Sequence, residues 1–414
     1  MNSNLKTMSR NKDGQHALAP KLRFPEFRDF PEWKKEKVDE LVDAVTPRKK
    51  LPTSSYSSKG AFPIIDQSQN AICGWTDDHE ALIQDGLPLI IFGDHTCILK
   101  LVDRPFAQGA DGIKILQSRS GVGTPYLYQY LSYQPVVTEV YKRHYSILKE
   151  KVVLFPDFKT GEQQKIADCL SSLDELIAAQ ARKVDALNIH KKGLMQRLFP
   201  REGETRPRLR FPEFQNAPDW ERSSLGNIFE TTSGGTPSRS EADYWDGNVP
   251  WITTSLVNSG VITEAVEFIS KEGLKNSSAK LFPRGTVLIA MYGQGKTRGQ
   301  VALLGIEAAT NQACAAVLPT KGIKPYFVFL NLAGRYEEFR NLSNSGGQDN
   351  LSQGLIREIP FAYPLDCEEQ RRIVDCLSSL DEAILAQTDK LETLKTHKKG
   401  LMQQLFPSAQ AVVA

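Results

Sequence analysis

The string most suggestive of chemistry is Ala290-Met291-Tyr292-Gly293-Gln294-Gly295-Lys296-Thr297, which ends like a phosphate-binding loop. Such a loop requires a glycine where Ala290 stands, and a following helix whose N-terminal amides hold the phosphate. The segment that follows, Gln300-Val301-Ala302-Leu303-Leu304, is apolar and predicts a strand instead. We therefore do not expect nucleotide binding at this loop.

Other candidate catalytic and metal-binding patterns are incomplete. Gly93-Asp94-His95-Thr96 could supply an acid–base pair or half of a metal site, but no second cluster stands at ligand spacing, which favours a role in a turn or facing DNA. The six cysteines show no Cys-x-x-Cys spacing, so buried thiols are expected rather than metal ligands or disulfides. The motifs of amino-methyltransferases and the Gly-x-Ser-x-Gly elbow are missing from the sequence. We therefore expect neither a catalytic residue nor a metal site.

Polar loops between short apolar runs offer a different chemistry. The apolar runs 62–65, 87–92, 286–290 and 313–318 predict strands, and the loops beside them are rich in amide, hydroxyl and guanidinium groups. Amide and guanidinium side chains pair bidentately with the edges of adenine and guanine. Solvated surface loops have the same composition, so each loop could equally be an ordinary surface. The DNA-binding candidates are Gln67, Gln69, Lys142, Arg143, Gln294, Lys296, Arg298 and Gln348.

An internal repeat in the sequence indicates which elements position these loops. Residues 162–200 and 369–407 align without a gap and agree at 26 of 39 positions. A second repeated motif, Leu-Arg-Phe-Pro-Glu-Phe, occurs at 22–27 and 209–214. Trp33 follows the first copy, and Trp220 follows the second. The two globular segments that lie between these repeated motifs show little similarity to each other. Two copies are too few for a solenoid, which needs about three repeats, and indicate instead a pseudo-dimer folded from one chain.

The repeated segments predict two long helices that pair. Leucine and isoleucine recur at three- and four-residue spacing through both copies, and Pro200 and Pro407 end them. The same stripe would suit any amphipathic bundle helix. However, the polar breaks coincide in an antiparallel pair, with Gln180 opposite Lys398 and Lys191 opposite Gln387. A polar layer of this kind fixes the register of a coiled coil.

The composition is that of a globular protein. The chain has 414 residues, 40% hydrophobic and 24% charged, and a net charge of +2. This charge is small for a protein that binds DNA alone, so either its basic groups are local or partners supply part of the neutralisation. The sequence shows no apolar leader and no run of ~18 apolar residues, so we expect a cytoplasmic protein that makes no contact with membranes.

Taken together, these strings make the chain similar to the specificity (S) subunits of type I restriction–modification systems. The resemblance covers nearly the whole chain. The Glu-Gln-x-x-Ile starts at 162 and 369, the Gly235-Thr236-Pro237-Ser238 turn, and the segments 64–69, 92–96, 251–255, 276–283, 292–299 and 310–313 all carry it. The first globular part departs from the pattern, because Val45-Thr46-Pro47-Arg48 lacks the glycines that precede Thr236.

The resemblance implies an α+β fold. In it, two mixed α/β target recognition domains are joined by two long antiparallel coiled-coil helices in a pseudo-two-fold internal duplication. The expected boundaries are a flexible segment 1–20, a first recognition domain 21–158, a first helix 159–200, a linker and second domain 201–366, a second helix 367–407, and a flexible tail 408–414. A shared connection in mid-chain and at the chain ends suggests that the two ends lie close together, outside either core.

The resemblance also implies a non-catalytic reader of double-stranded DNA. Each domain would bind half of a bipartite, asymmetric site, and the helices would set the gap and dock two methyltransferase subunits, with restriction/translocase subunits joining them. This chain would need no cofactor, since S-adenosylmethionine, ATP and Mg would serve adenine-N6 methylation and cleavage in the partner subunits. The alternatives are a coiled-coil adapter that does not bind DNA, and a fused nuclease–methyltransferase, which the missing motifs argue against.

Overall fold

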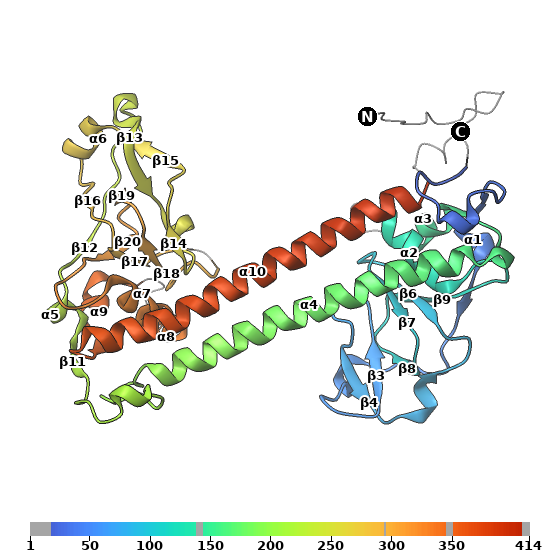
Figure 1. The fold of residues 1–414 in the computed structure, drawn as a ribbon, viewed down its shortest axis with the longest axis horizontal. Coiled ribbons are helices and arrows are strands. Elements are labelled where there is room, and N and C mark those ends of the chain that lie inside the picture. Colours follow the sequence, from blue (N-terminus) through green and yellow to red (C-terminus); the bar gives the residue numbers. More distant parts are fainter. Residues whose placement is uncertain (1–17, 138–143, 294, 345–350, 408–414) are drawn as a thin grey trace. The chain divides into compact units, whose positions relative to one another are not determined.

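The computed structural model describes residues 18–137, 144–293, 295–344 and 351–407 (Figure 1). The chain divides into two compact units, Met1–Ala181 with Asp389–Ala414, and Arg182–Thr388. Two long helices, α4 (Glu162–Leu198) and α10 (Cys367–Leu405), each contribute one part to each unit. The predicted long helices are thus confirmed.

The first unit is built on two four-stranded sheets. Their strand orders are β2-β9-β6-β7 and β4-β3-β8-β5, and a separate ribbon pairs β1 with β10. All strand pairs are antiparallel except β3 with β8. The elements are β1 (Lys34–Lys37), α1 (Val38–Leu41), β2 (Val42–Val45), β3 (Phe62–Ile65), β4 (Gly74–Thr76), β5 (Leu82–Ile83), β6 (Leu89–Gly93), β7 (Leu99–Val102), β8 (Phe106–Gln108), β9 (Ile113–Ser118), α2 (Thr124–Tyr133), α3 (Tyr145–Glu150) and β10 (Val152–Phe155).

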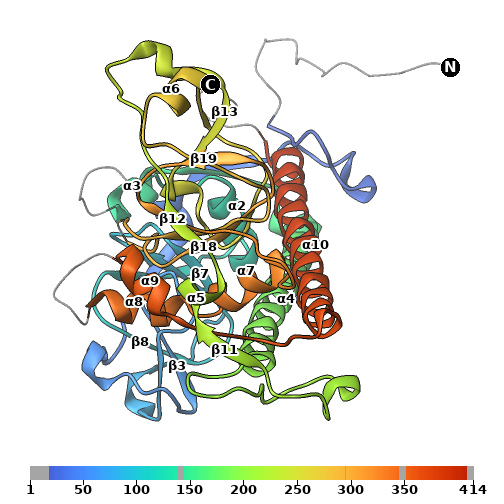
Figure 2. The same cartoon turned by 90° about the vertical axis from the view of Figure 1, so that its left-hand side faces the viewer.

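The second unit contains a five-stranded and a four-stranded sheet. Their orders are β12-β20-β17-β18-β14 and β15-β13-β19-β16, and a ribbon pairs β11 with β21. Helix α7 packs on β17 and β18, and Figure 2 shows it beside β18. The elements are β11 (Glu221–Ser224), α5 (Leu225–Ile228), β12 (Thr231–Ser233), β13 (Trp245–Ile252), β14 (Val261–Ile262), β15 (Glu267–Ile269), α6 (Lys271–Lys275), β16 (Leu281–Phe282), β17 (Val287–Ala290), β18 (Val301–Leu304), β19 (Ala308–Thr310), β20 (Cys314–Val317), α7 (Pro325–Ala333), α8 (Tyr336–Asn344), α9 (Gln353–Glu358) and β21 (Pro360–Tyr363).

The two units have corresponding strand orders. The sheet β2-β9-β6-β7 matches β12-β20-β17-β18, which β14 extends, and β4-β3-β8-β5 matches β15-β13-β19-β16. The parallel pair β3–β8 has its counterpart in β13–β19. This correspondence was not visible in the sequence, because a strand buried on both faces, such as β6 or β17, requires apolar side chains but no particular ones. The predicted strands are confirmed: 62–65 has the bounds of β3, 87–92 is shifted to β6 (89–93), and 286–290 and 313–318 are shortened to β17 (287–290) and β20 (314–317).

Each core is closed by the end of a long helix. In the first unit Phe406, which follows α10 and is fully buried, contacts Tyr126, Tyr130 and Tyr133 of α2, with ring centroids 5.2–5.8 Å apart. In the second unit Phe199, which follows α4, contacts Trp220 and Phe327 at 6.3 and 5.4 Å. The Leu-Phe-Pro ending of both repeats is therefore a core element, which explains why both copies keep it.

One boundary expectation can be compared with the structure only at residues 18–20. The segment 1–20 was expected to be flexible and outside the core, but Leu18 packs against the first core and its carbonyl accepts a hydrogen bond from Trp33 N at 3.0 Å. Thr205 accepts from Trp220 N in the same way at 2.9 Å. A backbone hydrogen bond to a buried tryptophan fixes this segment. Residues 1–17 and 408–414 lie outside the described residues.

Replacing Phe406 by alanine should destabilise the first unit. Removing a fully buried aromatic ring leaves a cavity, and such changes lower the free energy of unfolding by ~3–5 kcal/mol. Phe158→Ala is the matched control, because 55% of Phe158 is exposed and its loss should change that free energy by less than ~0.5 kcal/mol. Denaturant unfolding of both variants checks this, and equal effects would contradict the role given to Phe406.

Candidate nucleic-acid interface

In the first unit, loops that follow three strands are joined by hydrogen bonds. They are 66–73 after β3, 94–98 after β6 and 109–112 after β8. Thr96 Oγ1 donates to Gln67 O at 2.8 Å, and Asp94 N donates to Gly112 O at 2.7 Å. These loops therefore form one polar surface at one end of the two sheets.

The two glutamines predicted in this surface are placed differently. Gln67 is half-buried, and its Oε1 atom is enclosed without a hydrogen-bond partner among the described residues. A buried carbonyl left unpaired costs free energy, so this amide gains from a partner that reaches it. Gln69 is exposed and lines a hollow of about 370 Å³ with Lys100 and Tyr128. Of the two amides, Gln69 is the more accessible to a ligand.

Lys100 holds the first of these loops by its main chain. Its Nζ donates to Asp66 O at 2.8 Å and to Asn70 O at 2.6 Å. Burial lowers the pKa of Lys100, although the charges of Cys73 and Asp66 act in the opposite direction. Burial also acts to raise the pKa of Asp66, but hydrogen bonds from Cys73 Sγ (2.7 Å) and Ser68 N (2.8 Å) outweigh it and lower that pKa. The loop base is thus a closed polar cluster.

Asp94 has a structural role in the first unit. Its Oδ1 accepts from Tyr145 N at 2.8 Å, and its carbonyl accepts from His144 N at 3.0 Å. Lys142 and Arg143 lie outside the described residues, but the chain directly after them is thereby held against the loop after β6. Within the described residues, no group of three or more His, Cys, Asp and Glu side chains is arranged to hold a metal ion. The turn role is the one that these contacts support for Gly93-Asp94-His95-Thr96.

In the second unit β17 and β18 form an antiparallel hairpin, and residues 291–293 and 295–300 are the described part of its loop. Ala290 N and O pair with Gln300 O and Gly299 N, both at 2.9 Å. Gly295 (φ 62°) and Gly299 (φ 83°) adopt left-handed conformations that favour glycine. A strand follows, as predicted, so this loop lacks the helix N-terminus that a phosphate-binding loop needs.

Helix α8 holds this hairpin loop by its carbonyls. Tyr336 OH donates to Lys296 O at 2.9 Å, and Arg340 Nη1 donates to Gly295 O at 2.7 Å. The Lys296 side chain remains exposed, and Arg298 is half-buried. Gln294 and Gln348 lie outside the described residues. Leu351, the first described residue after Asn344, donates from N to Met291 O at 3.1 Å and so lies beside this loop.

The prediction missed the residues beside the hairpin. Thr236 Oγ1 donates to the Gln312 amide, Asn311 N donates to Ile252 O at 3.0 Å, and Trp251 Nε1 donates to Gly235 O at 3.0 Å. Gly234 and Gly235 allow this approach, since a side chain on either would overlap the backbone of Thr310 or Ser278. The Gly-Gly-Thr-Pro turn and the Thr-Asn-Gln string were the available signals, but they were used only for the resemblance.

The register residues of the helices also have unexpected neighbours. Lys191 Nζ forms an ion pair with Asp381 in the second unit, and Lys398 Nζ pairs with Asp174 at 2.6 Å in the first. Each aspartate lies six residues before the glutamine predicted opposite that lysine, Gln387 or Gln180. Gln180 is buried, and Gln387 is half-buried. Each lysine thus has an aspartate as its ion-pair partner, and the predicted placement of a glutamine opposite each lysine stays a prediction.

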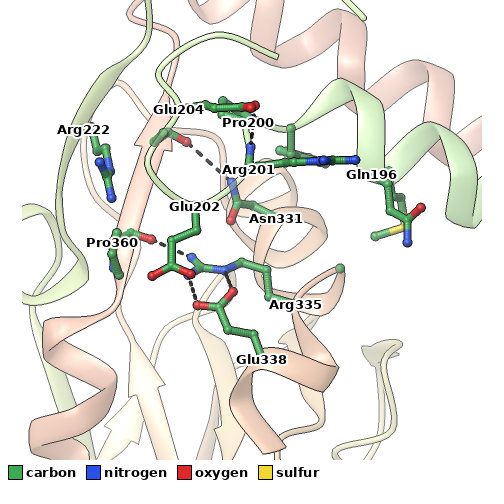
Figure 3. Close-up of a pocket in the computed structure, with 14 residues that line it drawn as sticks. Gln196, Pro200, Arg201, Glu202, Glu204, Arg222, Asn331, Arg335, Glu338 and Pro360 are labelled. Carbon is green, nitrogen blue, oxygen red and sulfur yellow. Dashed lines mark hydrogen bonds and ion pairs between the residues drawn. The ribbon is translucent and has the colours of Figure 1, made fainter. Parts of the chain in front are cut away.

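A separate pocket of about 340 Å³ lies at the end of α4 in the second unit (Figure 3). Arg335 Nε donates to Glu338 Oε2 at 2.7 Å, and its Nη1 donates to Pro360 O at 2.6 Å. Glu204 Oε2 accepts from Arg201 N at 3.3 Å. Arg335 is thus bound to Glu338 of α8 and to β21, whereas the Glu204 contact lies within the linker 199–204. The residues that line the pocket contain no nucleophile–base pair.

Comparison with known proteins shows what this arrangement resembles. Residues 218–396 match the family model described as the type I restriction modification DNA specificity domain. The EcoR124I/EcoR124II specificity subunit of Escherichia coli is 25% identical over 86% of this chain and 88% of its own length. The MjaIX specificity subunit of Methanocaldococcus jannaschii is 29% identical over 45% of this chain and 44% of its length.

The fold is also similar to that of a solved structure. The type I restriction-modification system S subunit from M. genitalium aligns with a TM-score of 0.61 and 19% identity, covering 94% of this chain and 99% of that one. The resemblance to type I specificity subunits predicted from the motifs is therefore confirmed. Within the described residues, no helix is long and apolar enough to cross a membrane.

Lys100→Met should loosen the loop after β3 while leaving its sheet intact. The change removes both hydrogen bonds to the carbonyls of Asp66 and Asn70, so amide hydrogen exchange of residues 66–73 should quicken by about tenfold or more. Lys59→Met, at an exposed lysine of the same unit, is the control. Unchanged exchange at Ser68 in Lys100→Met would contradict the role of Lys100.

Proposed function

We propose that this chain, which carries a type I restriction modification DNA specificity domain, is the sequence-reading subunit of a type I restriction–modification complex. Each unit would bind one half of a bipartite, asymmetric site in double-stranded DNA. The observation that carries the proposal is that two units with corresponding strand orders each gather polar loops at strand ends. Amide and guanidinium groups on such loops match the donor and acceptor pattern of the major groove.

We propose that the side chains of this chain recognise DNA sequence and do not catalyse a reaction. Methyl transfer to adenine N6 with S-adenosylmethionine, and cleavage driven by ATP with Mg, are assigned to two methyltransferase subunits and to restriction/translocase subunits. The net charge of +2 agrees with this division. DNA affinity depends largely on neutralised phosphates, so partner subunits would supply many of the phosphate contacts.

The long helices are proposed to form an antiparallel coiled coil that arises from an internal duplication. The ion pairs Lys191–Asp381 and Lys398–Asp174 support this, because each links α4 to α10, and the repeat offset of 207 relates Lys191 to Lys398 and Asp174 to Asp381. A pseudo-two-fold helix pair offers two equivalent surfaces. Two copies of one methyltransferase subunit would dock there.

A gel-shift assay separates this proposal from the coiled-coil adapter. The chain would be mixed with duplex DNA, with and without its methyltransferase subunits, after methylation sequencing of a host carrying the complete system has identified the site. The proposed function requires tighter binding of that duplex than of one with a scrambled half-site. Equal binding of both duplexes by the assembled complex would favour the adapter.

Lengthening the helices should change the gap in the site but not its half-sites. Inserting four residues near the exposed Arg182 adds ~6 Å of helix at ~1.5 Å per residue, against ~3.4 Å per base pair along one strand. The gap should grow by one or two base pairs. Methylation mapping checks this, and altered half-site bases with the old gap would refute the spacing role.

Arg298→Ala should weaken methylation of the cognate site and relax one position of one half-site. A bidentate base contact contributes ~1–3 kcal/mol of discrimination, whereas a phosphate contact weakens all sequences alike. Lys296→Ala, in the same loop, provides the comparison. If Arg298→Ala lowered the affinity for cognate and random duplexes equally, Arg298 would be a phosphate contact instead.

A further inference from the structure

The first two residues shared by the repeats, glutamate and glutamine, are fully buried where each long helix begins. Glu162 and Gln163 in α4, and Glu369 and Gln370 in α10, expose at most 1% of their surface. Glutamate and glutamine are rarely buried so completely unless every polar atom finds a partner. Their contacts identify what each helix start is attached to.

Each glutamate binds an arginine from the segment that leads into its unit; Arg210 is buried, and the Arg23 side chain is 10% exposed. Arg23 donates to both carboxylate oxygens of Glu162 at 2.7 and 2.6 Å, and Arg210 does the same to Glu369 at 2.7 Å for both bonds. Each guanidinium also donates to two carbonyls of its own segment, Phe30 and Pro31 in one unit, Ala217 and Pro218 in the other. The helix start is thus fastened to the leading segment.

The glutamines fasten the helix start to the globular part. Gln163 Nε2 donates to Gly121 O at 3.0 Å and Pro156 O at 2.7 Å, and Gly123 N donates to its Oε1 at 2.8 Å. Gln370 repeats the pattern with Gly322 O at 3.0 Å, Pro364 O at 2.9 Å and Lys324 N at 2.8 Å. One amide therefore joins three segments: the helix, the end of β10 or β21, and the start of α2 or α7. We call each Arg–Glu–Gln set a helix socket.

The same leading segments also bind the end of the other long helix. Leu22 N donates to Gln404 O of α10 at 2.9 Å, and Leu209 N donates to Arg197 O of α4 at 2.8 Å. In each unit the segment next to the socket arginine therefore touches one helix at its start and the other near its end. A socket fixes how the unit is mounted on both helices.

The two sockets differ in one hydrogen bond. Trp220 Nε1 donates to Glu369 Oε1 at 3.1 Å, whereas Trp33 Nε1 in the first unit is buried without a partner among the described residues. The second socket therefore has one donor more on its carboxylate. This difference allows a variant that weakens a socket without opening it.

From this geometry we propose that the helix sockets are positioning elements that set the gap-length specificity of the DNA site, with Gln163 and Gln370 as the positioning residues. The inference rests on the proposed function and deepens it. The length of the helices can set a fixed gap only if each globular part is held rigidly to them. A small rotation of the globular part at the helix start would displace a distant loop by the ~3.4 Å that separates one base pair from the next. Within the described residues, the hydrogen bonds of the sockets reach none of Gln67, Gln69, Lys296 and Arg298, so the sockets are proposed to act on the gap and not on the bases.

The test uses the full chain assembled with its methyltransferase subunits. Methyl transfer is measured on duplexes with both half-sites at the natural gap, at gaps one base pair shorter and longer, and on a duplex with one altered half-site. Gln163→Ala and Gln370→Ala are compared with Gln164→Ala and Arg371→Ala, which change the adjacent, exposed positions of the same helices. Thermal melting of every complex is recorded alongside.

Gln163→Ala should lower the preference for the natural gap by tenfold or more and leave the preference for the correct half-site within twofold, and the control variants should match the unaltered chain. Equal losses of both preferences, or an unchanged gap preference, would overturn the proposal. If the unaltered complex does not prefer the correct half-site, the proposed DNA-reading function is itself wrong. That result differs from the two outcomes that would overturn the socket proposal alone.

Trp220→Phe provides a second test should the glutamine variants not assemble. It removes the indole hydrogen bond to Glu369 together with part of a buried ring, and the gap preference should fall by about tenfold, the lower end of what one hydrogen bond to a charged group contributes. Trp33→Phe removes an indole that lacks such a bond and is the matched control. Identical gap preferences in these two variants would contradict the role of the sockets.

Discussion

The buried pairing of an arginine with a glutamate at the start of each long helix is the contact on which the rest of the structure depends. Arg210 and Glu369 expose 5% and 1% of their side chains, and the hydrogen bond to Glu369 raises the pKa of Arg210. Leaving one such charge buried alone costs ~3–5 kcal/mol, so neither partner can leave without the other. The helix, the leading segment and the globular part consequently behave as one body within each unit.

Around these anchors the two units preserve topology while their sequences diverge. Fully buried strands such as β6 and β17 need apolar side chains of suitable volume, which many sequences supply. The sockets are less tolerant, because a buried carboxylate and amide demand particular donors and acceptors. This difference explains why similarity between the two halves is high along the helices and low in the sheets.

The candidate reading loops are held by their main chain rather than by their exposed side chains. Lys100 binds the carbonyls of Asp66 and Asn70, and Tyr336 and Arg340 bind those of Lys296 and Gly295. Every residue has a carbonyl, so such contacts persist when the side chain changes. A loop built in this way can carry different side chains without losing its shape, which suits the proposed role in reading DNA sequence.

The sequence by itself determined the elements that repeat or alternate: the two long helices, the apolar strands, and the resemblance carried by the repeated motifs. These elements can be predicted because the spacing of apolar residues along consecutive positions indicates whether a segment forms a helix or a strand. Only the tertiary structure decided which distant residues meet. It gave Lys191 and Lys398 aspartate partners, placed Leu18 against a core, and brought Leu351 to Met291. Lysine side chains reach acceptors a turn or more away, and strand pairing joins segments far apart in the chain, so such contacts depend on packing that no local pattern records.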